Sequence, residues 1–258
     1  MTEKGSPRAD ASALARSIAD EVPHVLHVDD DRAFLELAET FLSRHGLIAS
    51  TAESTTEARE RLASSAVDCI VCDYDMPEEN GVEFLESVRA DRPNLPFVLF
   101  TGKGSEEVAS EAISAGVTDY LQKETGTEQW RVLANRVENL VERRRSERLA
   151  EYSFRAMETA REGISLIDVD GRFVYVNRAY ADFVGYDRED LVGRHWEELY
   201  QDADLEDVYD EVLPAVRQDG EWEGEHVYLR ADGSTIPVDH ALSYCEEGVL
   251  VCLIRAGG

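Results

Sequence analysis

The chain has 258 residues, enough for two domains of ordinary size, and 43% of them are hydrophobic, so it can build folded cores. Its formal net charge of −28 argues against binding to nucleic acid or to an anionic membrane surface. No run of 18 apolar residues and no apolar segment near the amino end occurs, so we expect neither a membrane span nor a secretory signal, and we expect a cytoplasmic protein.

The acidity comes with a scarcity of lysine. Only Lys4, Lys103 and Lys123 are present, and the other basic residues are arginines. High salt would screen the self-repulsion of such a surface, so we predict a salt-loving source organism. An acidic protein from a mesophile remains the alternative.

A regular alternation of short apolar runs and amphipathic stretches follows a predicted disordered tail over 1–22. It predicts five βα units over 23–128, that is, a doubly wound five-stranded parallel sheet of the flavodoxin-like type with helices on both faces. The predicted strands are Val25–Val28, Leu47–Thr51, Cys69–Cys72, Phe97–Phe100 and Val117–Leu121, and the helices are Arg32–His45, Thr55–Ser64, Gly81–Ala90, Glu106–Ala115 and one from about Thr127.

The last of these helices has no predicted stop. Between Glu128 and Met157 there is neither Pro nor Gly, so we predict that it continues as a connecting helix over 129–155. Its apolar stripe could pair with a second copy as a short coiled coil. For the arginine-rich run at 142–148 we favour a solvated, salt-bridged helix face.

Over 156–258 the sequence pattern changes and predicts paired strands and turns. A hairpin is predicted around Asp170-Gly171, short helical pieces follow, and three longer strands end the chain at Glu223–Arg230, Thr235–Cys245 and Val249–Ile254. This order predicts an α+β domain with an antiparallel sheet.

Four cysteines are compatible with disulfides or zinc by number alone. Cys69 and Cys72 lie three apart in a predicted strand and therefore point to opposite faces, so they cannot share a metal. Cys245 and Cys252 also lie in strand-like runs. We predict buried free thiols at all four positions.

Polar residues end the predicted parallel strands, where the active site of such a sheet lies. They are Asp29 and Asp30, Asp73, Thr101 and Lys123. Three converging carboxylates suit Mg²⁺, and Asp73 could then attack a phosphodonor to give an aspartyl phosphate, with Lys123 and Thr101 contacting phosphoryl oxygens. Each residue alone has a simpler explanation, such as a helix cap at Asp31. Those explanations do not account for all of these residues occurring in order at the ends of the predicted strands. His27, inside the first strand, is predicted to be a hydrogen-bonded core histidine.

These motifs resemble the receiver domain of two-component response regulators over about 23–142. They are Val28-Asp29-Asp30-Asp31, Cys72-Asp73-Tyr74-Asp75-Met76-Pro77 with Gly81, Phe100-Thr101-Gly102 and Asp119-Tyr120-Leu121-Gln122-Lys123. The resemblance implies a phosphoacceptor rather than an enzyme, with phosphoryl transfer to Asp73 from a partner sensor histidine kinase. It implies Mg²⁺ on Asp30, Asp73 and the backbone carbonyl of Asp75, with Asp29 in the outer shell. Thr101 and Tyr120 would form the switch.

Two features limit this resemblance. Glu124 stands where the family has Pro after the lysine, so the output surface is less certain than the chemistry. Asp73-Tyr74-Asp75 also resembles the nucleophile motif of haloacid-dehalogenase-type phosphohydrolases, although Pro77 and the place of the motif on the third strand depart from it. A scaffold with a degenerate receiver is the other alternative.

Residues 152–256 resemble a PAS domain, which senses a ligand or mediates dimer contacts. The matching segments are Ala160–Asn177, Phe183–Tyr186 with Leu191–Gly193, Trp222–Glu225 and Arg230–Ser234. No Cys lies between 73 and 244 and no His lies in Leu205–Arg217, so the ligand is unknown and we expect none. No output motif follows, so the signal is expected to leave through protein contacts, such as a homodimer through the connecting helix and the PAS domain.

Overall fold

The computed structural model describes residues 22–102, 106–245 and 248–256, so the predicted tail lies almost wholly outside the described residues. The chain divides into two units after Ala150, and each unit is described by itself. No helix in the described part of the chain is both long enough and apolar enough to cross a membrane.

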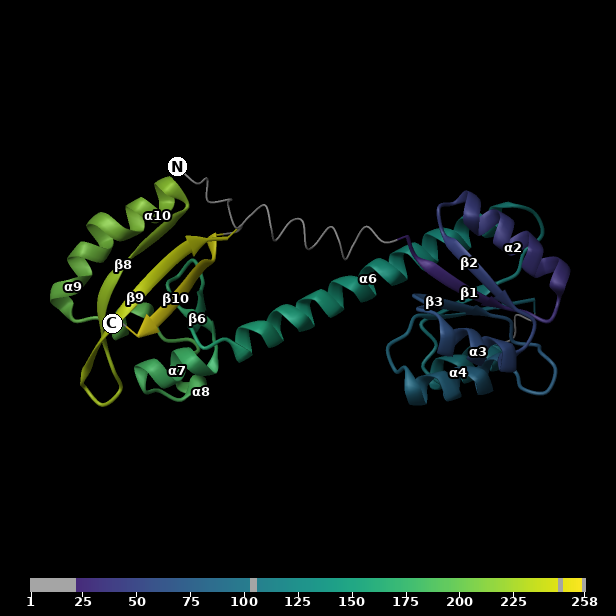
Figure 1. Ribbon diagram of the computed structural model, residues 1–258, viewed down its shortest axis with the longest axis horizontal. Helices are drawn as coiled ribbons and strands as arrows, with labels where there is room; N and C mark the ends of the chain where they lie inside the picture. The colour runs from purple at the N-terminus through teal and green to yellow at the C-terminus, as the bar shows by residue number, and fades with distance from the viewer. Residues whose placement is uncertain (1–21, 103–105, 246–247, 257–258) are drawn as a thin grey trace. The chain divides into compact units, whose positions relative to one another are not determined.

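The first unit is built on a parallel sheet of five strands within the described residues, in the order β2-β1-β3-β4-β5. This is the predicted doubly wound arrangement, with β1 and β3 as neighbours in the sheet (Figure 1). The strands are β1 His24–Val28, β2 Ile48–Ala52, β3 Cys69–Cys72, β4 Phe97–Thr101 and β5 Asp119–Gln122.

Helices cover both faces of this sheet because successive strand residues point to opposite sides. Ile70 and Cys72 face a core shared with α3, α4 and α5, whereas Cys69 and Val71 face a core shared with α2 and α6. The two thiols therefore lie on opposite faces, as predicted. The helices are α2 Arg32–Arg44, α3 Thr55–Ser64, α4 Gly81–Asp91, α5 Glu106–Ser114 and α6 Glu128–Thr159.

Helices α2 and α4 begin at side-chain caps in the loops that follow β1 and β3. Asp31 accepts hydrogen bonds from the backbone N–H groups of Ala33 and Phe34, which fixes the start of α2 directly after the aspartate pair. Asn80 caps α4 in a reciprocal capping box with Glu83. Local capping therefore sets the direction in which the chain leaves the carboxyl edge of the sheet.

Helix α6 packs its first turns onto the sheet through Trp130, Leu133, Ala134, Val137 and Val141. The prediction of a solvated face for the following arginines is wrong at one position. The Arg145 side chain is only 13% exposed and pairs with Asp68 Oδ2 at 3.1 Å, because the apolar face of the helix holds it against the body of the unit.

The second unit contains an antiparallel sheet in the order β7-β6-β10-β9-β8 within the described residues. This confirms the predicted α+β architecture. Its strands are β6 Gly163–Ile167, β7 Phe173–Val176, β8 Glu221–Leu229, β9 Thr235–Tyr244 and β10 Leu250–Ala256, and its helices are α7 Arg178–Val184, α8 Arg188–Leu191, the 3-10 helix Trp196–Leu199, α9 Asp202–Asp207, the π-helical turn Val208–Val212 and α10 Leu213–Asp219.

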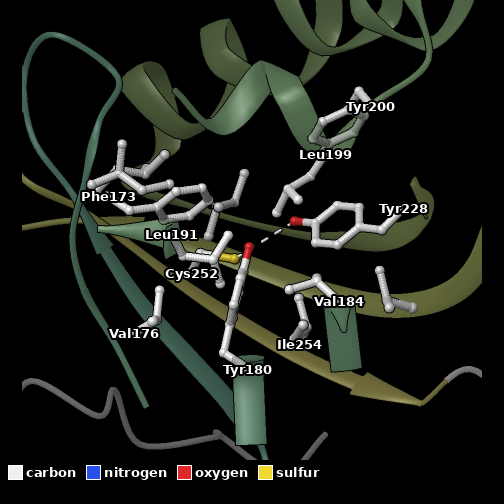
Figure 2. Close-up of a cluster of buried hydrophobic side chains, with 14 of the residues drawn as sticks. Phe173, Val176, Tyr180, Val184, Leu191, Leu199, Tyr200, Tyr228, Cys252 and Ile254 are labelled. Carbon is white, nitrogen blue, oxygen red and sulfur yellow. Dashed lines mark hydrogen bonds between the residues drawn. The ribbon is translucent and has the colours of Figure 1, made fainter. Parts of the chain in front are cut away.

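The core of this unit fills the space between one face of the sheet and the short helices. Figure 2 shows its centre, where Tyr180 of α7 points toward Tyr228 of β8 beside Cys252 of β10. Cys69, Cys72 and Cys252 are buried free thiols, as predicted, but Cys245 is exposed because it lies in the turn that follows β9.

The end of α6 is tied to this second sheet by one buried amide. Asn177 Nδ2 donates to the carbonyl oxygens of Met157 and Glu162 at 2.8 and 2.9 Å, and Asn177 Oδ1 accepts from the N–H groups of Ile164 and Tyr180. With all these groups satisfied, the side chain fixes the path from α6 into β6.

Candidate functional site

The predicted aspartates meet at the carboxyl edge of the parallel sheet. Strands β1 and β3 are hydrogen-bonded neighbours, and the N–H of Asp73 donates to Val28 O at 2.9 Å, which sets Asp73 level with the end of β1. One carboxylate oxygen from each of Asp29, Asp30 and Asp73 lies within 4.8 Å of the other two. Asp29 and Asp73 are buried and Asp30 is exposed, so the cluster opens to solvent on one side.

Lys123, one residue beyond β5, reaches the same cluster. Its ammonium donates to Asp29 Oδ2 at 2.6 Å and lies 3.1 Å from Asp73 Oδ1. The N–H of Lys123 donates to Thr101 O at 2.8 Å, which holds the lysine beside the end of β4. The positive charge offsets part of the mutual repulsion of the carboxylates.

The carboxyl of Asp29 is otherwise fully engaged, since its Oδ1 accepts from the N–H of Asp31 at 3.0 Å. Burial raises the pKa of Asp29 above its ordinary value, and the hydrogen bond from Lys123 only partly opposes this. A cation bound nearby would favour the ionised form of Asp29.

Asp73 differs from Asp29 in the hydrogen bonding of its carboxylate oxygens. Asp73 Oδ1 is buried and accepts no hydrogen bond among the described residues, because the Lys123 ammonium approaches it without hydrogen-bonding geometry. A buried carboxylate oxygen is costly when it is left without a donor or a cation. Lys123 therefore offsets the charge of this oxygen without satisfying its hydrogen-bonding capacity.

The other predicted site residues lie around this cluster. Thr101 is fully buried at the end of β4, and Tyr120, on β5, is half-buried against the core between the sheet and helices α3 to α5. Asp75 follows Asp73 on the loop that leads to α4. The assigned roles of Thr101, Tyr120 and Asp75 stay predictions.

Gly81, the first residue of α4, packs directly against the backbone of the predicted phosphoacceptor. A Cβ at this position would overlap Asp73 O and would lie 2.9 Å from Leu99 Cδ1. Its φ is not positive, so the need for glycine here is one of space and not of backbone conformation.

The residues present fit a magnesium ion. The donors are hard carboxylate oxygens from Asp29, Asp30 and Asp73, one of them exposed to solvent, which leaves room for the waters that Mg²⁺ retains. The unsatisfied Asp73 Oδ1 is a further sign that the site suits a cation or a phosphoryl group.

An aromatic cluster behind the site was not identified from the sequence. Phe34 of α2 lies beneath Lys123, with Nζ 4.4 Å from the ring centroid, and packs against Trp130 of α6 and Phe100 of β4. The apolar spacing in α2 marks Phe34 as a core residue, but nothing in the sequence pairs it with a lysine nearly ninety residues away.

His27 lies in the same cluster and differs from the prediction. It is fully buried, yet within the described part of the chain neither ring nitrogen has a hydrogen-bond partner, because the rings of Phe34, Phe100 and Trp130 surround it. Burial, with a smaller effect of Lys123, lowers the pKa of His27 to about 3, so the ring is neutral.

Comparison with known proteins locates two families on the chain. A family model of the response regulator receiver domain matches residues 25–135, and a model of the PAS fold matches residues 151–255. The response regulator SaeR of Staphylococcus aureus is 31% identical over 120 residues, which are 46% of this chain and 51% of SaeR. The chain thus matches about half the length of this relative.

Solved structures similar to the chain include single domains of both kinds. The receiver domain of a Francisella response regulator is 29% identical, with a TM-score of 0.43, over 47% of this chain and 98% of that domain. A PAS domain from Colwellia psychrerythraea is 23% identical, with a TM-score of 0.40, over 42% of this chain and 97% of that domain. From the two family matches, the chain carries a response regulator receiver domain at 25–135 followed by a PAS domain at 151–255.

Proposed function

We propose that the protein is a two-component response regulator that is phosphorylated on Asp73 by a sensor histidine kinase. The observation that carries the proposal is the environment of Asp73 Oδ1, a buried carboxylate oxygen to which no described residue donates a hydrogen bond, beside two further aspartates and 3.1 Å from the Lys123 ammonium. Such a group can act as a nucleophile toward phosphorus, provided that the negative charge around it is neutralised.

In the proposed reaction, a carboxylate oxygen of Asp73 forms a bond to phosphorus while the N–P bond of the kinase phosphohistidine breaks, and the imidazole is the leaving group. Lys123, which lies 3.1 Å from Asp73 Oδ1, would neutralise one phosphoryl oxygen, and the Thr101 hydroxyl would donate to another. Mg²⁺, when bound by Asp30, Asp73 and the Asp75 carbonyl with Asp29 in support, would supply charge neutralisation.

The chemistry of the chain would then be limited to gaining and losing its own phosphoryl group. We further propose a cytoplasmic protein without nucleic-acid contacts, in line with the net charge of −28. Homodimerisation would use α6, where Tyr152 and Phe154 expose 52% and 48% of their surface, together with the PAS domain.

The direct test is incubation with acetyl phosphate and Mg²⁺ in high-salt buffer, followed by intact-mass measurement. We expect one added phosphoryl group on the wild type, dependent on Mg²⁺ and absent from Asp73→Asn. Asp91→Asn, which changes an exposed aspartate at the end of α4, is the matched control and should keep the adduct. Continuous release of phosphate from phosphoesters would instead indicate a phosphohydrolase. If neither acetyl phosphate nor any of the kinases from the source organism labels the folded chain, the proposal is wrong.

A further inference from the structure

The arginine-rich run of α6 lines an open pocket at the amino edge of the parallel sheet. The pocket has a volume of about 240 Å³, and its walls are the residues 67–68 before β3, the residues 92–96 before β4 and one face of α6. The acidic cluster follows β1 and β3 and therefore lies at the opposite, carboxyl edge of the sheet. The pocket is thus a separate feature of the receiver.

The face of α6 that borders the pocket carries three arginines. Its lining residues follow the i, i+3, i+4, i+7 spacing of a single helix face, and they are Val141, Arg144, Arg145 and Arg148. The segment that leads into β4 adds a fourth arginine, Arg92, from another wall. Guanidinium groups from two separate parts of the chain therefore meet around one space.

The charge of the lining is opposite to that of the chain. Four arginines and one aspartate, Asp68, line the pocket and give it a formal charge of +3, whereas the whole chain has 26 basic and 54 acidic residues. Cations that face the same concave space repel one another, and such a space concentrates their field. An anion bound there would relieve this repulsion.

Two of the guanidinium groups are held in position by the protein. Arg145 Nη2 donates to Asp68 Oδ2 at 3.1 Å, and the same oxygen accepts from the N–H of His24 at 3.0 Å. Arg92 Nη2 donates to the carbonyl oxygen of Leu62. Because these hydrogen bonds fix two of the cations at the wall, less side-chain entropy would be lost when an anion binds.

We propose that this pocket binds the diphosphate group of a small molecule, either free pyrophosphate or a nucleoside diphosphate. The planar guanidinium matches the oxygens of a phosphoryl group and can donate two parallel hydrogen bonds to them. Arg144 and Arg148 are one helical turn apart, with about 5–6 Å between Cβ atoms of such a pair, so they can contact neighbouring phosphoryl groups.

The size of the pocket fits the charged group better than a whole nucleotide. Sites that enclose drug-sized ligands have volumes of about 300–1,000 Å³, and this pocket is smaller. A nucleoside would therefore lie at the rim, against apolar side chains such as Pro93 and Leu95.

A bound diphosphate would connect α6 to the segment before β4. Arg92 would contact it from one wall and Arg144 from another, beyond Val141, which is the last buried residue in the described part of α6. The ligand would thus hold the start of the connecting helix against the receiver, independently of phosphorylation on Asp73.

The test is calorimetric titration of the full chain with pyrophosphate and with ADP, in high-salt buffer containing EDTA. EDTA removes the cations through which the acidic cluster would hold a phosphate. We expect one site per chain for each ligand, and at least about 10-fold weaker binding of AMP and adenosine. Tighter binding of ADP than of pyrophosphate would identify a nucleotide as the source of the diphosphate, and equal or weaker binding would identify free pyrophosphate.

Two neighbouring arginines provide a matched pair of variants. Arg144→Gln should lower the affinity for pyrophosphate by about 10- to 100-fold, because a lining guanidinium is lost. Arg143→Gln removes the same charge from an exposed residue outside the lining and should change the affinity by less than about twofold.

Hydrogen exchange of the wild type tests the location without any variant. Pyrophosphate should slow amide exchange over 141–148 and at Asn94 and Leu95, and it should leave 29–31 unchanged. The proposal is overturned by absence of saturable binding, by equal losses in Arg143→Gln and Arg144→Gln, or by AMP binding as tightly as ADP. Tighter binding of a glutamate-rich peptide than of ADP would also overturn it and would make the pocket a protein-docking site.

Discussion

The ring of Phe34 packs against the indole of Trp130 with their centroids 4.9 Å apart, which joins α2 to the first turn of α6. Phe34 also carries the Lys123 ammonium on its face, and Lys123 contacts both Asp29 and Asp73. A continuous set of contacts therefore leads from the predicted phosphoacceptor to the start of the long helix. A displacement of Lys123 would alter the surroundings of Trp130.

This relationship predicts a fluorescence signal. In a variant carrying Trp196→Phe and Trp222→Phe, Trp130 is the only tryptophan left in the chain. Acetyl phosphate with Mg²⁺ should then change its emission, because Lys123 would turn toward the phosphoryl group and leave the face of Phe34. Adding Asp73→Asn should abolish the change, and adding Phe34→Leu should reduce it. An equally large change in the Phe34→Leu background would show that the signal takes another route.

Removal of the lysine should destabilise the receiver unless a cation replaces it. Lys123→Met leaves the buried Asp29 carboxyl and Asp73 without their positive partner, so we expect a loss of about 2–3 kcal/mol in the free energy of unfolding, moderated because Lys123 is 18% exposed. Mg²⁺ should recover more stability in this variant than in the wild type, as measured by urea unfolding. Arg143→Met, at an exposed ion pair, should leave stability unchanged. A Lys123→Met protein as stable as the wild type without metal would refute the account.

Gly81 should not tolerate a side chain. Gly81→Ala places a methyl group against Asp73 O and Leu99, so we expect a loss of about 1–3 kcal/mol and slower phosphorylation of Asp73. Gly102→Ala is the matched control, since a Cβ there meets no described residue within 4 Å and its φ is not positive. Thermal unfolding and intact-mass time courses measure both effects. Equal behaviour of the two variants would mean that α4 shifts at little cost.

Replacement of His27 should stabilise the protein. A buried imidazole without hydrogen bonds costs free energy, so His27→Leu should raise the free energy of unfolding by about 1–3 kcal/mol at neutral pH.

The same substitution should change the response to acid. The pKa of His27 falls from 6.5 to about 3 on folding, so between these values the unfolded chain binds a proton that the folded chain does not. The free energy of unfolding should therefore decline as the pH falls through this window. His27→Leu should flatten the decline without removing it, because folding also lowers the pKa of His240 to about 3. Urea unfolding across the window measures the slope, and an unchanged slope in the variant would contradict the burial of a neutral His27.

The sequence by itself determined the architecture of both halves and the residues of the acidic site. Regular βα alternation leaves few ways to cover a parallel sheet, and the carboxyl ends of neighbouring strands must meet at one edge. The sequence alone is therefore enough to group Asp29, Asp73, Thr101 and Lys123. The cap at Asp31 was predictable for the same local reason, since it depends on residues only two or three positions away.

Only the tertiary structure decided the contacts that depend on register and on helix rotation. Whether a buried histidine finds a partner depends on which rings the neighbouring helices bring to it, and His27 meets only aromatic ones. The Arg145 side chain is largely buried beside Asp68, and the Cys245 thiol is exposed. Both outcomes depend on tertiary packing, which the spacing of apolar residues in the sequence does not reveal. The meeting of Tyr228, His240 and Cys252 requires the strand order β8-β9-β10 and its register, because a slip of one residue would turn each side chain to the other face.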